Sequence, residues 1–290
     1  MYFSDRLRTT IWVASVTAGV LVILYPLLTG LYLPKQPYLI PLTQQVNNII
    51  TVGVIIAIAF PAFVEYSNYR WVRQFEGAVP RLLRDIAEAV RSGETLTKAV
   101  EVAAEKGSDP LSKELARVIA LFVLGASWEE SVCTLNKQIK SPTVQRLATI
   151  LVEANESGGK TSEILGMSVE LLSSLDQYKE EQQNNMKPYL YTIYASIAIF
   201  LIISFVVISQ FLFPLASPTA NQVSMKANSM NILDINYYVS ILFWAATVEA
   251  FFGGIIAGKI GDRTYPAGLR HSVFLIIISL VCFNIMGGFW

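Results

Sequence analysis

The sequence is poor in the residues that usually build active sites and metal centres. Its 290 residues include one histidine and two cysteines, and only 15% are charged, against about 25% in an average soluble domain. Cys133 falls in a charged segment and Cys282 in an apolar run, so we expect neither a disulfide nor a metal site. The net charge of zero gives no overall field that would attract nucleic acid.

Candidate catalytic groups are equally scarce. We place His271, the only histidine, at the cytoplasmic edge of the last apolar run, and interpret it as structural or interfacial. The stretch 157–160 (Ser-Gly-Gly-Lys) lacks the spacing of a phosphate-binding loop and follows a helix instead of a strand. Glu153 and Glu156 lie on neighbouring turns of one helix, which favours a solvated face over an acid–base pair. We therefore expect no enzymatic activity, no cofactor and no metal.

Long apolar runs are what the sequence does contain, and 53% of its residues are hydrophobic. A spanning helix needs about 20 mostly apolar residues. Pro26 and Pro34 stand where a signal peptidase would need small residues, so the first run is predicted to be a span and not a cleaved signal peptide. The five predicted spans cover residues 11–33, 48–64, 189–213, 237–260 and 272–290.

The basic residues predict the orientation of these spans. With the N-terminus inside, every lysine and arginine except Lys35 and Lys226 faces the cytoplasm, as the positive-inside rule requires. The C-terminus then lies outside the cell membrane. We predict a multi-pass, all-α protein with two spans in residues 1–64, a cytoplasmic domain in 65–187 and three spans in 188–290.

The cytoplasmic segment is predicted to form six helices. Gly77 and Pro80 suggest a break and a new helix start. Gly93, Gly125 and the pair Gly158 and Gly159 then stop later helices. Helix starts are indicated by hydroxyl or acidic caps and by proline at the first position; they are Thr95, Asp109–Pro110, Ser127 with Glu130, Ser141–Pro142 and Thr161. Short loops make the six helices antiparallel, so the three glycine turns lie at the end away from the membrane.

The fourth span carries the most unusual intramembrane residues. Glu249 lies within it, and intramembrane acids are costly and usually face another helix or a functional pathway. Gly254 and Gly258 have the G-x-x-x-G spacing that allows close helix packing, either within the chain or across a dimer.

Several short motifs, in order, resemble a known family. They are Pro80-Arg81-Leu82-Leu83-Arg84-Asp85-Ile86-Ala87-Glu88, Arg91-Ser92-Gly93-Glu94-Thr95-Leu96, Pro110 to Leu115, Glu156-Ser157-Gly158-Gly159, and the tail Gly254 to Lys259 with Ala267 to Ser272. The six-helix domain between the spans, residues 65–187, resembles the F domain of type II secretion and type IV pilus platform proteins, and the resemblance to this family covers most of residues 65–290. The archaeal, archaellum-like branch is favoured, because bacterial relatives usually carry Gly-Glu where this sequence has Ala154-Asn155.

The resemblance implies a platform that couples a cytoplasmic hexameric secretion ATPase to the insertion of pilin- or archaellin-like subunits. Many such platforms carry two F domains and this sequence carries one, so it would form a homodimer, or a heterodimer with a second F-domain protein. We predict that the glycine-turn end contacts the ATPase through charged residues, namely Arg91, Glu94, Lys98, Glu129, Glu130 and Lys160. The lipid bilayer is the other expected partner.

Two other functions fit the same features. A small transporter or channel with a cytoplasmic regulatory domain would explain Glu249, although five spans without evident inverted repeats count against it. A membrane-tethered signalling or scaffold protein would need the helical domain but no contact with pilins.

Overall fold

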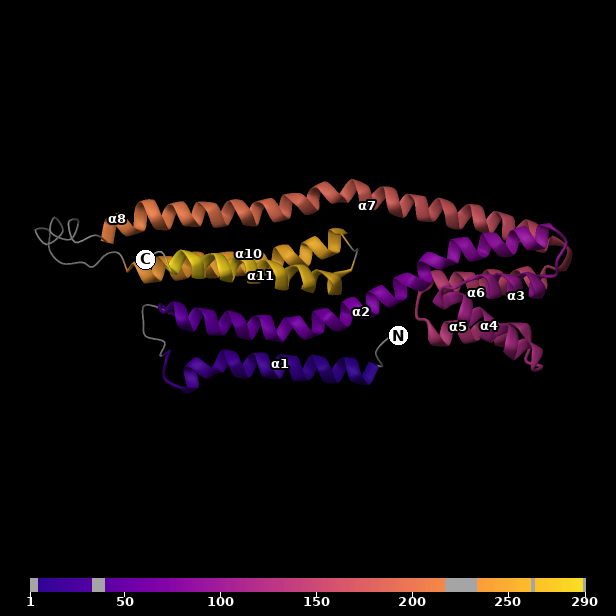
Figure 1. The fold of residues 1–290 in the computed structure, drawn as a ribbon, viewed down its shortest axis with the longest axis horizontal. Helices are drawn as coiled ribbons and strands as arrows, with labels where there is room; N and C mark the ends of the chain where they lie inside the picture. Colours follow the sequence, from indigo (N-terminus) through magenta and orange to yellow (C-terminus); the bar gives the residue numbers. More distant parts are fainter. Residues whose placement is uncertain (1–4, 33–39, 217–233, 262–263, 289–290) are drawn as a thin grey trace, which may run out of the picture. The chain divides into compact units, whose positions relative to one another are not determined.

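The computed structural model describes residues 5–32, 40–216, 234–261 and 264–288. Within these ranges every regular element is a helix and none is a strand, so the predicted all-α class is confirmed (Figure 1). The chain divides into two compact parts. We call Ser67–Asn184 the helical unit, and Asp5–Tyr66 with Asn185–Trp290 the membrane unit. Lys35, Lys226 and Arg263 lie outside the described residues.

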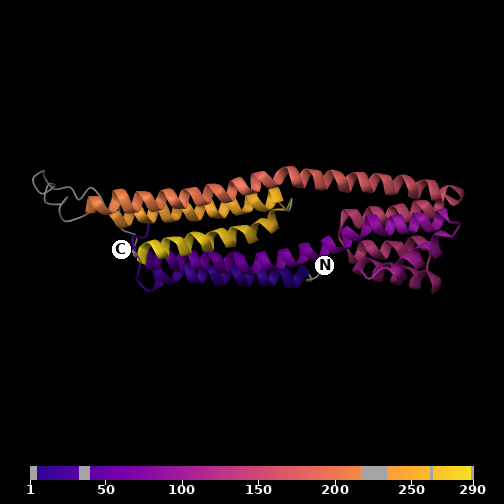
Figure 2. The ribbon, with the colours of Figure 1, turned by 45° about the horizontal axis from the view of Figure 1, so that its top comes forward.

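The membrane unit is built from long apolar helices. Five helices are long and apolar enough to cross a membrane, judged by length and composition, which confirms the predicted number of spans. Figures 1 and 2 show these helices running lengthwise beside one another. The elements are α1 (Asp5–Leu28), the first half of α2 (Gln44–Arg91), the second half of α7 (Thr161–Val206), a π-helical segment Val207–Leu212, α8 (Phe213–Ala216), α10 (Ile235–Gly261) and α11 (Tyr265–Gly288).

Small residues let pairs of helices in this unit approach closely. A Cβ atom on Gly19 of α1 would lie 2.6 Å from Ala57 Cβ and 2.7 Å from the carbonyl oxygen of Gly53, both on α2. A Cβ on Gly254 of α10 would overlap the backbone of Ser272 on α11. Glycine is therefore needed at these helix crossings, because any side chain would clash with the neighbouring helix.

The predicted break at Gly77 and Pro80 is wrong, because α2 runs without interruption from Gln44 to Arg91. Gly77 has open space around the position of a Cβ. The helix continues because Val79, Leu82 and other apolar residues on this stretch are fully buried in the core. Burying each large apolar side chain is worth about 1.5–3 kcal/mol, which together exceeds the cost of about 3 kcal/mol for an interior proline.

The helical unit packs six helical segments around one apolar core. Leucine, isoleucine, valine and alanine dominate this core, and the largest fully buried side chains include Leu83, Ile86, Leu115, Leu147 and Leu165. The segments are the second half of α2, α3 (Leu96–Lys106), α4 (Pro110–Val123), α5 (Trp128–Gln138), α6 (Pro142–Glu156) and, after a 3-10 turn Gly158–Lys160, the first half of α7.

Local sequence signals set the helix starts in this unit. Ser127 and Glu130 form the predicted reciprocal capping box at α5, and the Ser141 hydroxyl accepts a hydrogen bond from the Thr143 amide at α6. Thr95 occupies the position before α3, but its side chain makes no capping hydrogen bond. Its hydroxyl lies 3.4 Å from the Thr97 hydroxyl instead, so the prediction of a Thr95 side-chain cap is wrong.

Candidate docking surface of the helical unit

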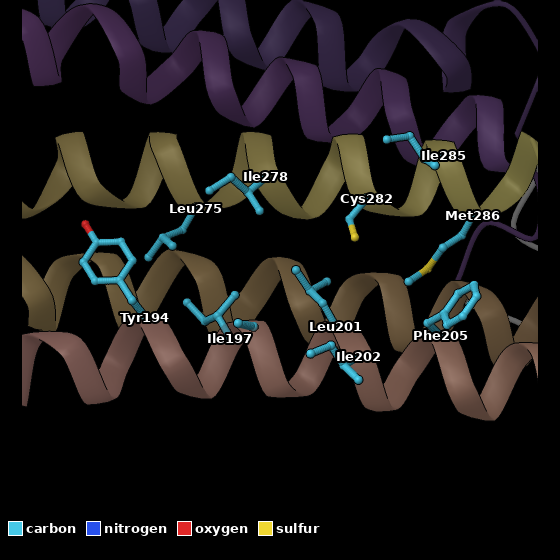
Figure 3. A pocket seen from close by; sticks show the side chains of 11 residues that line it. Tyr194, Ile197, Leu201, Ile202, Phe205, Leu275, Ile278, Cys282, Ile285 and Met286 are labelled. Atoms are coloured by element: carbon cyan, nitrogen blue, oxygen red, sulfur yellow. The ribbon is translucent and has the colours of Figure 1, made fainter.

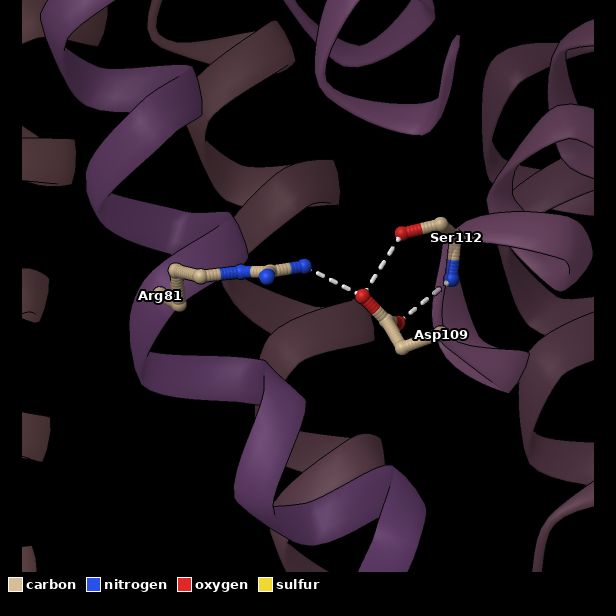
Figure 4. Close-up of polar contacts among 3 residues, drawn as sticks. All are labelled: Arg81, Asp109 and Ser112. Atoms are coloured by element: carbon tan, nitrogen blue, oxygen red, sulfur yellow. Dashed lines mark hydrogen bonds and ion pairs between the residues drawn. The ribbon is translucent and has the colours of Figure 1, made fainter. Parts of the chain in front are cut away.

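Two polar contacts define one end of the helical unit. The Ser141 hydroxyl donates to Glu76 Oε1 at 2.6 Å, which brings the α5–α6 turn beside the part of α2 that enters the unit. Arg81, five residues further along α2, forms an ion pair with Asp109 in the α3–α4 turn (Figure 4). Asp109 also accepts from the Ser112 amide at 3.0 Å and the Ser112 hydroxyl at 3.1 Å. One carboxylate therefore caps α4 and fixes it to α2.

Three glycines in left-handed backbone conformation mark the opposite end. The φ angles of Gly93, Gly125 and Gly158 are 102°, 98° and 55°, a region that side chains other than glycine rarely adopt. Consecutive helices from α3 to α6 pack against each other, so successive turns alternate between the two ends. Along α2, Glu76 and Arg91 are separated by about 22 Å at 1.5 Å per residue. We call the end formed by residues 91–95, 124–128 and 157–161 the glycine-turn end.

All six predicted docking residues are exposed, but two of them already have local partners. Lys98 donates to Glu101 at 2.9 Å, and this hydrogen bond and the Glu101 charge raise the pKa of Lys98. Glu130 accepts from the Ser127 amide at 3.2 Å in the capping box. Within the described ranges, no ion pair involves the other four predicted residues, Arg91, Glu94, Glu129 and Lys160. Their charges are therefore available on the surface.

An apolar feature at this end was missed by the sequence reasoning. Val123 and Leu124, where α4 meets its glycine turn, are 77% and 83% exposed. The apolar run 121–124 ends directly at Gly125 and contains more apolar residues than one buried helix face can use. That excess of apolar residues could have predicted an exposed apolar surface at this turn. Val123 and Leu124 are adjacent, and contiguous exposed apolar side chains bordered by charges make this end a candidate protein-binding surface.

The intramembrane candidates lie at helix–helix contacts within the membrane unit. Glu249 Oε1 accepts a hydrogen bond of 3.0 Å from Ser196 on α7. Gly254 and Gly258 both face α11 of the same chain, against Ser272 and Gly268. The G-x-x-x-G spacing was compatible with packing within the chain or with a dimer. In the structure, Gly254 and Gly258 pack against α11 of the same chain.

His271 connects α11 to α7. Its Nδ1 shares a hydrogen bond of 2.5 Å with the Tyr194 hydroxyl, and its Nε2 lies 3.2 Å from Arg270 Nη2. The Arg270 guanidinium in turn lies over the Tyr66 ring at 4.3 Å, a cation–π distance. Within the described part of the chain, no group of three His, Cys, Asp or Glu residues could hold a metal ion. Cys133 and Cys282 are both free thiols.

Comparison with known proteins finds one relative and no solved structure. An uncharacterized protein of Methanocaldococcus jannaschii is 25% identical over 232 residues, which cover 80% of this chain and 37% of that protein. The chain therefore spans little more than a third of that relative's length. No solved structure matches the chain.

A family model supplies the more specific assignment. Residues 82–209 match the model described as type II secretion system (T2SS), protein F. The match begins in α2 within the helical unit and ends in the π-helical segment after α7, so it includes the glycine-turn end. Proteins of this family are membrane platform proteins. Over residues 82–209, this chain is therefore similar to type II secretion system protein F.

Proposed function

We propose that this protein is the membrane platform of a type IV filament or type II secretion-like assembly machine. It would couple a cytoplasmic secretion ATPase to the insertion of pilin- or archaellin-like subunits. The observation that carries the proposal is the F-domain match, which covers most of the helical unit and continues into a membrane helix. Five long apolar helices are consistent with a role in the bilayer.

The glycine-turn end is the proposed ATPase contact. Arg91 and Lys160 are exposed cations at this end, and Glu94 and Glu129 are exposed anions. Leu124 adds an apolar side chain that is 83% exposed. An apolar contact surrounded by charges of both signs is typical of protein interfaces, in which complementary charge selects the partner and the apolar centre supplies affinity.

A binding experiment with a matched control tests this contact. The double variant Arg91→Glu with Lys160→Glu should weaken binding of the full-length protein to its cognate ATPase at least tenfold, and Leu124→Ser should weaken it similarly. Lys113→Glu is the control, because Lys113 is an exposed cation near the start of α4, at the other end of the unit. Equal loss in the control, or no loss in the double variant, would contradict the proposed contact.

A genetic experiment tests the function itself. Deleting the gene should abolish assembly or secretion of the pilin-like subunits encoded in the same cell, while those subunits accumulate in the membrane. The wild-type gene should restore assembly, and the Arg91→Glu, Lys160→Glu double variant should not. Normal assembly in the deletion strain would reject the platform role.

A further inference from the structure

An apolar groove runs along the membrane unit between α7 and α11. It encloses about 470 Å³. The α7 wall includes Ile197, Leu201 and Phe205, and the α11 wall includes Leu275, Cys282 and Met286. Figure 3 shows Cys282 and Met286 pointing from α11 toward α7. Apart from the Tyr194 hydroxyl at one end, the labelled side chains in this view carry no oxygen or nitrogen. Such a groove suits a hydrocarbon chain.

The same helix faces become basic beyond the Tyr194 end of the groove. Lys187 precedes Tyr194 by seven residues, two turns along the groove-lining face of α7. His271 precedes Leu275 by four residues, one turn along the groove-lining face of α11. The two apolar walls are therefore continued by a cation on one helix and an imidazole on the other.

Tyr194 joins the apolar and polar parts. It lines the groove, while its hydroxyl shares the 2.5 Å hydrogen bond with His271. Arg270 lies behind His271, with 3.2 Å between Nη2 and Nε2. The described acidic side chains of the membrane unit do not line the groove; Glu65 is paired with Arg8 and Glu249 accepts from Ser196. The end of the groove thus combines the hydrogen-bonding groups of Tyr194 and His271 with the cation Arg270, and Lys187 follows on the same face of α7.

We propose that this groove binds an anionic glycerophospholipid. One acyl chain occupies the space between α7 and α11, and the phosphate lies at Lys187, Tyr194, His271 and Arg270. This end of the membrane unit is the one from which α2 and α7 continue into the helical unit, and it is predicted to face the cytoplasm. The cytoplasmic leaflet is the one rich in anionic lipid, and basic pockets between spanning helices on that side bind anionic headgroups.

Charge is what selects this ligand over other apolar occupants. A zwitterionic phospholipid such as phosphatidylcholine would fill the groove equally well, but the cationic group of its headgroup would offset part of the attraction between its phosphate and Lys187 and Arg270. An apolar helix of another protein would use the walls but would leave no anion at the basic end. The proposal is independent of the platform function, because it rests only on residues of the membrane unit.

Native mass spectrometry of the full-length protein tests the proposal. The protein is purified in detergent with equal amounts of phosphatidylglycerol and phosphatidylcholine that carry identical chains, and the retained lipids are counted. We expect preferential retention of phosphatidylglycerol. Lys187→Gln and Arg270→Gln should each lower this preference about fivefold, the ratio that corresponds to about 1 kcal/mol for each basic residue. Arg6→Gln, an exposed cation on α1, should leave it unchanged.

A matched pair of substitutions tests the groove itself. Ala198 and Ala195 are both exposed on α7, one turn apart, but only Ala198 lines the groove. Ala198→Trp should fill the space and abolish retention of phosphatidylglycerol, whereas Ala195→Trp should not. Soluble glycerol phosphate should not compete, because it lacks the chain.

Four results would overturn the proposal. Equal retention of the two lipids by the wild-type protein would show that the groove has no charge selectivity. An unchanged preference in Ala198→Trp would place the lipid elsewhere, and displacement by glycerol phosphate would identify a free phosphate as the ligand. Co-purification of an apolar peptide in place of lipid would assign the groove to a partner helix.

Discussion

Gly258 of α10 offers the most stringent test of how the membrane unit is held together. A Cβ at this position would overlap the backbone of Gly268 on α11, and a backbone cannot rotate away as a flexible side chain can. Overpacking a well-packed contact costs about 1–3 kcal/mol. Alanine also raises helix propensity over glycine by about 1 kcal/mol, so Gly258→Ala should show a net loss of up to about 2 kcal/mol.

Gly261→Ala is the matched control, because it makes the same substitution in the same helix. A Cβ there would lie 3.9 Å from Leu190 Cδ1, an ordinary contact. This variant keeps the propensity gain without the clash, so it should be as stable as the wild type or up to about 1 kcal/mol more stable. The difference between the two variants isolates the clash.

The measurement is equilibrium unfolding of the purified protein in detergent at several protein concentrations. We expect a lower midpoint for Gly258→Ala than for Gly261→Ala, with the same difference at every concentration, since the contact is within one chain. Identical midpoints would refute close packing of α10 on α11. A difference that grows on dilution would assign the glycines to a dimer.

Two further predictions concern single side chains, and the same unfolding measurement checks both. Ser127→Ala should destabilise the protein by about 1 kcal/mol through loss of the α5 cap, whereas Thr95→Ala should have a smaller effect because that hydroxyl caps nothing; equal losses would contradict this reasoning. Glu65→Gln should cost about 1–3 kcal/mol, because the buried Glu65 carboxylate accepts from Arg8 at 2.6 Å and from Trp12 at 3.2 Å. An unchanged midpoint would show that Glu65 contributes no net stability.

Local signals predicted most of the helices. The apolar runs were long enough to show five candidate spans without any knowledge of packing. Asp109 followed by Pro110, and Ser127 with Glu130, specify helix starts through contacts within four residues. Such short-range chemistry can be read directly from the sequence.

The errors arose where tertiary contacts decided the outcome. Gly77 and Pro80 favour a break locally, but burial of Val79 and its neighbours keeps α2 continuous. The groove was not predicted, because it requires knowing which faces of α7 and α11 meet. Likewise, the spacing of Gly254 and Gly258 predicts close packing but does not name the partner helix.

The continuity of α2 has a mechanical consequence. Residues 76–80 are helical because the surrounding core holds them, while Pro80 cannot donate the backbone hydrogen bond that would otherwise join it to residue 76. If the core around Val79 loosened, α2 would therefore be able to bend at Gly77 and Pro80. The straightness of α2 therefore depends on the packing of the helical unit. While the core is packed, α2 is one continuous helix; if the core opens, residues 77–80 become a hinge between its two halves.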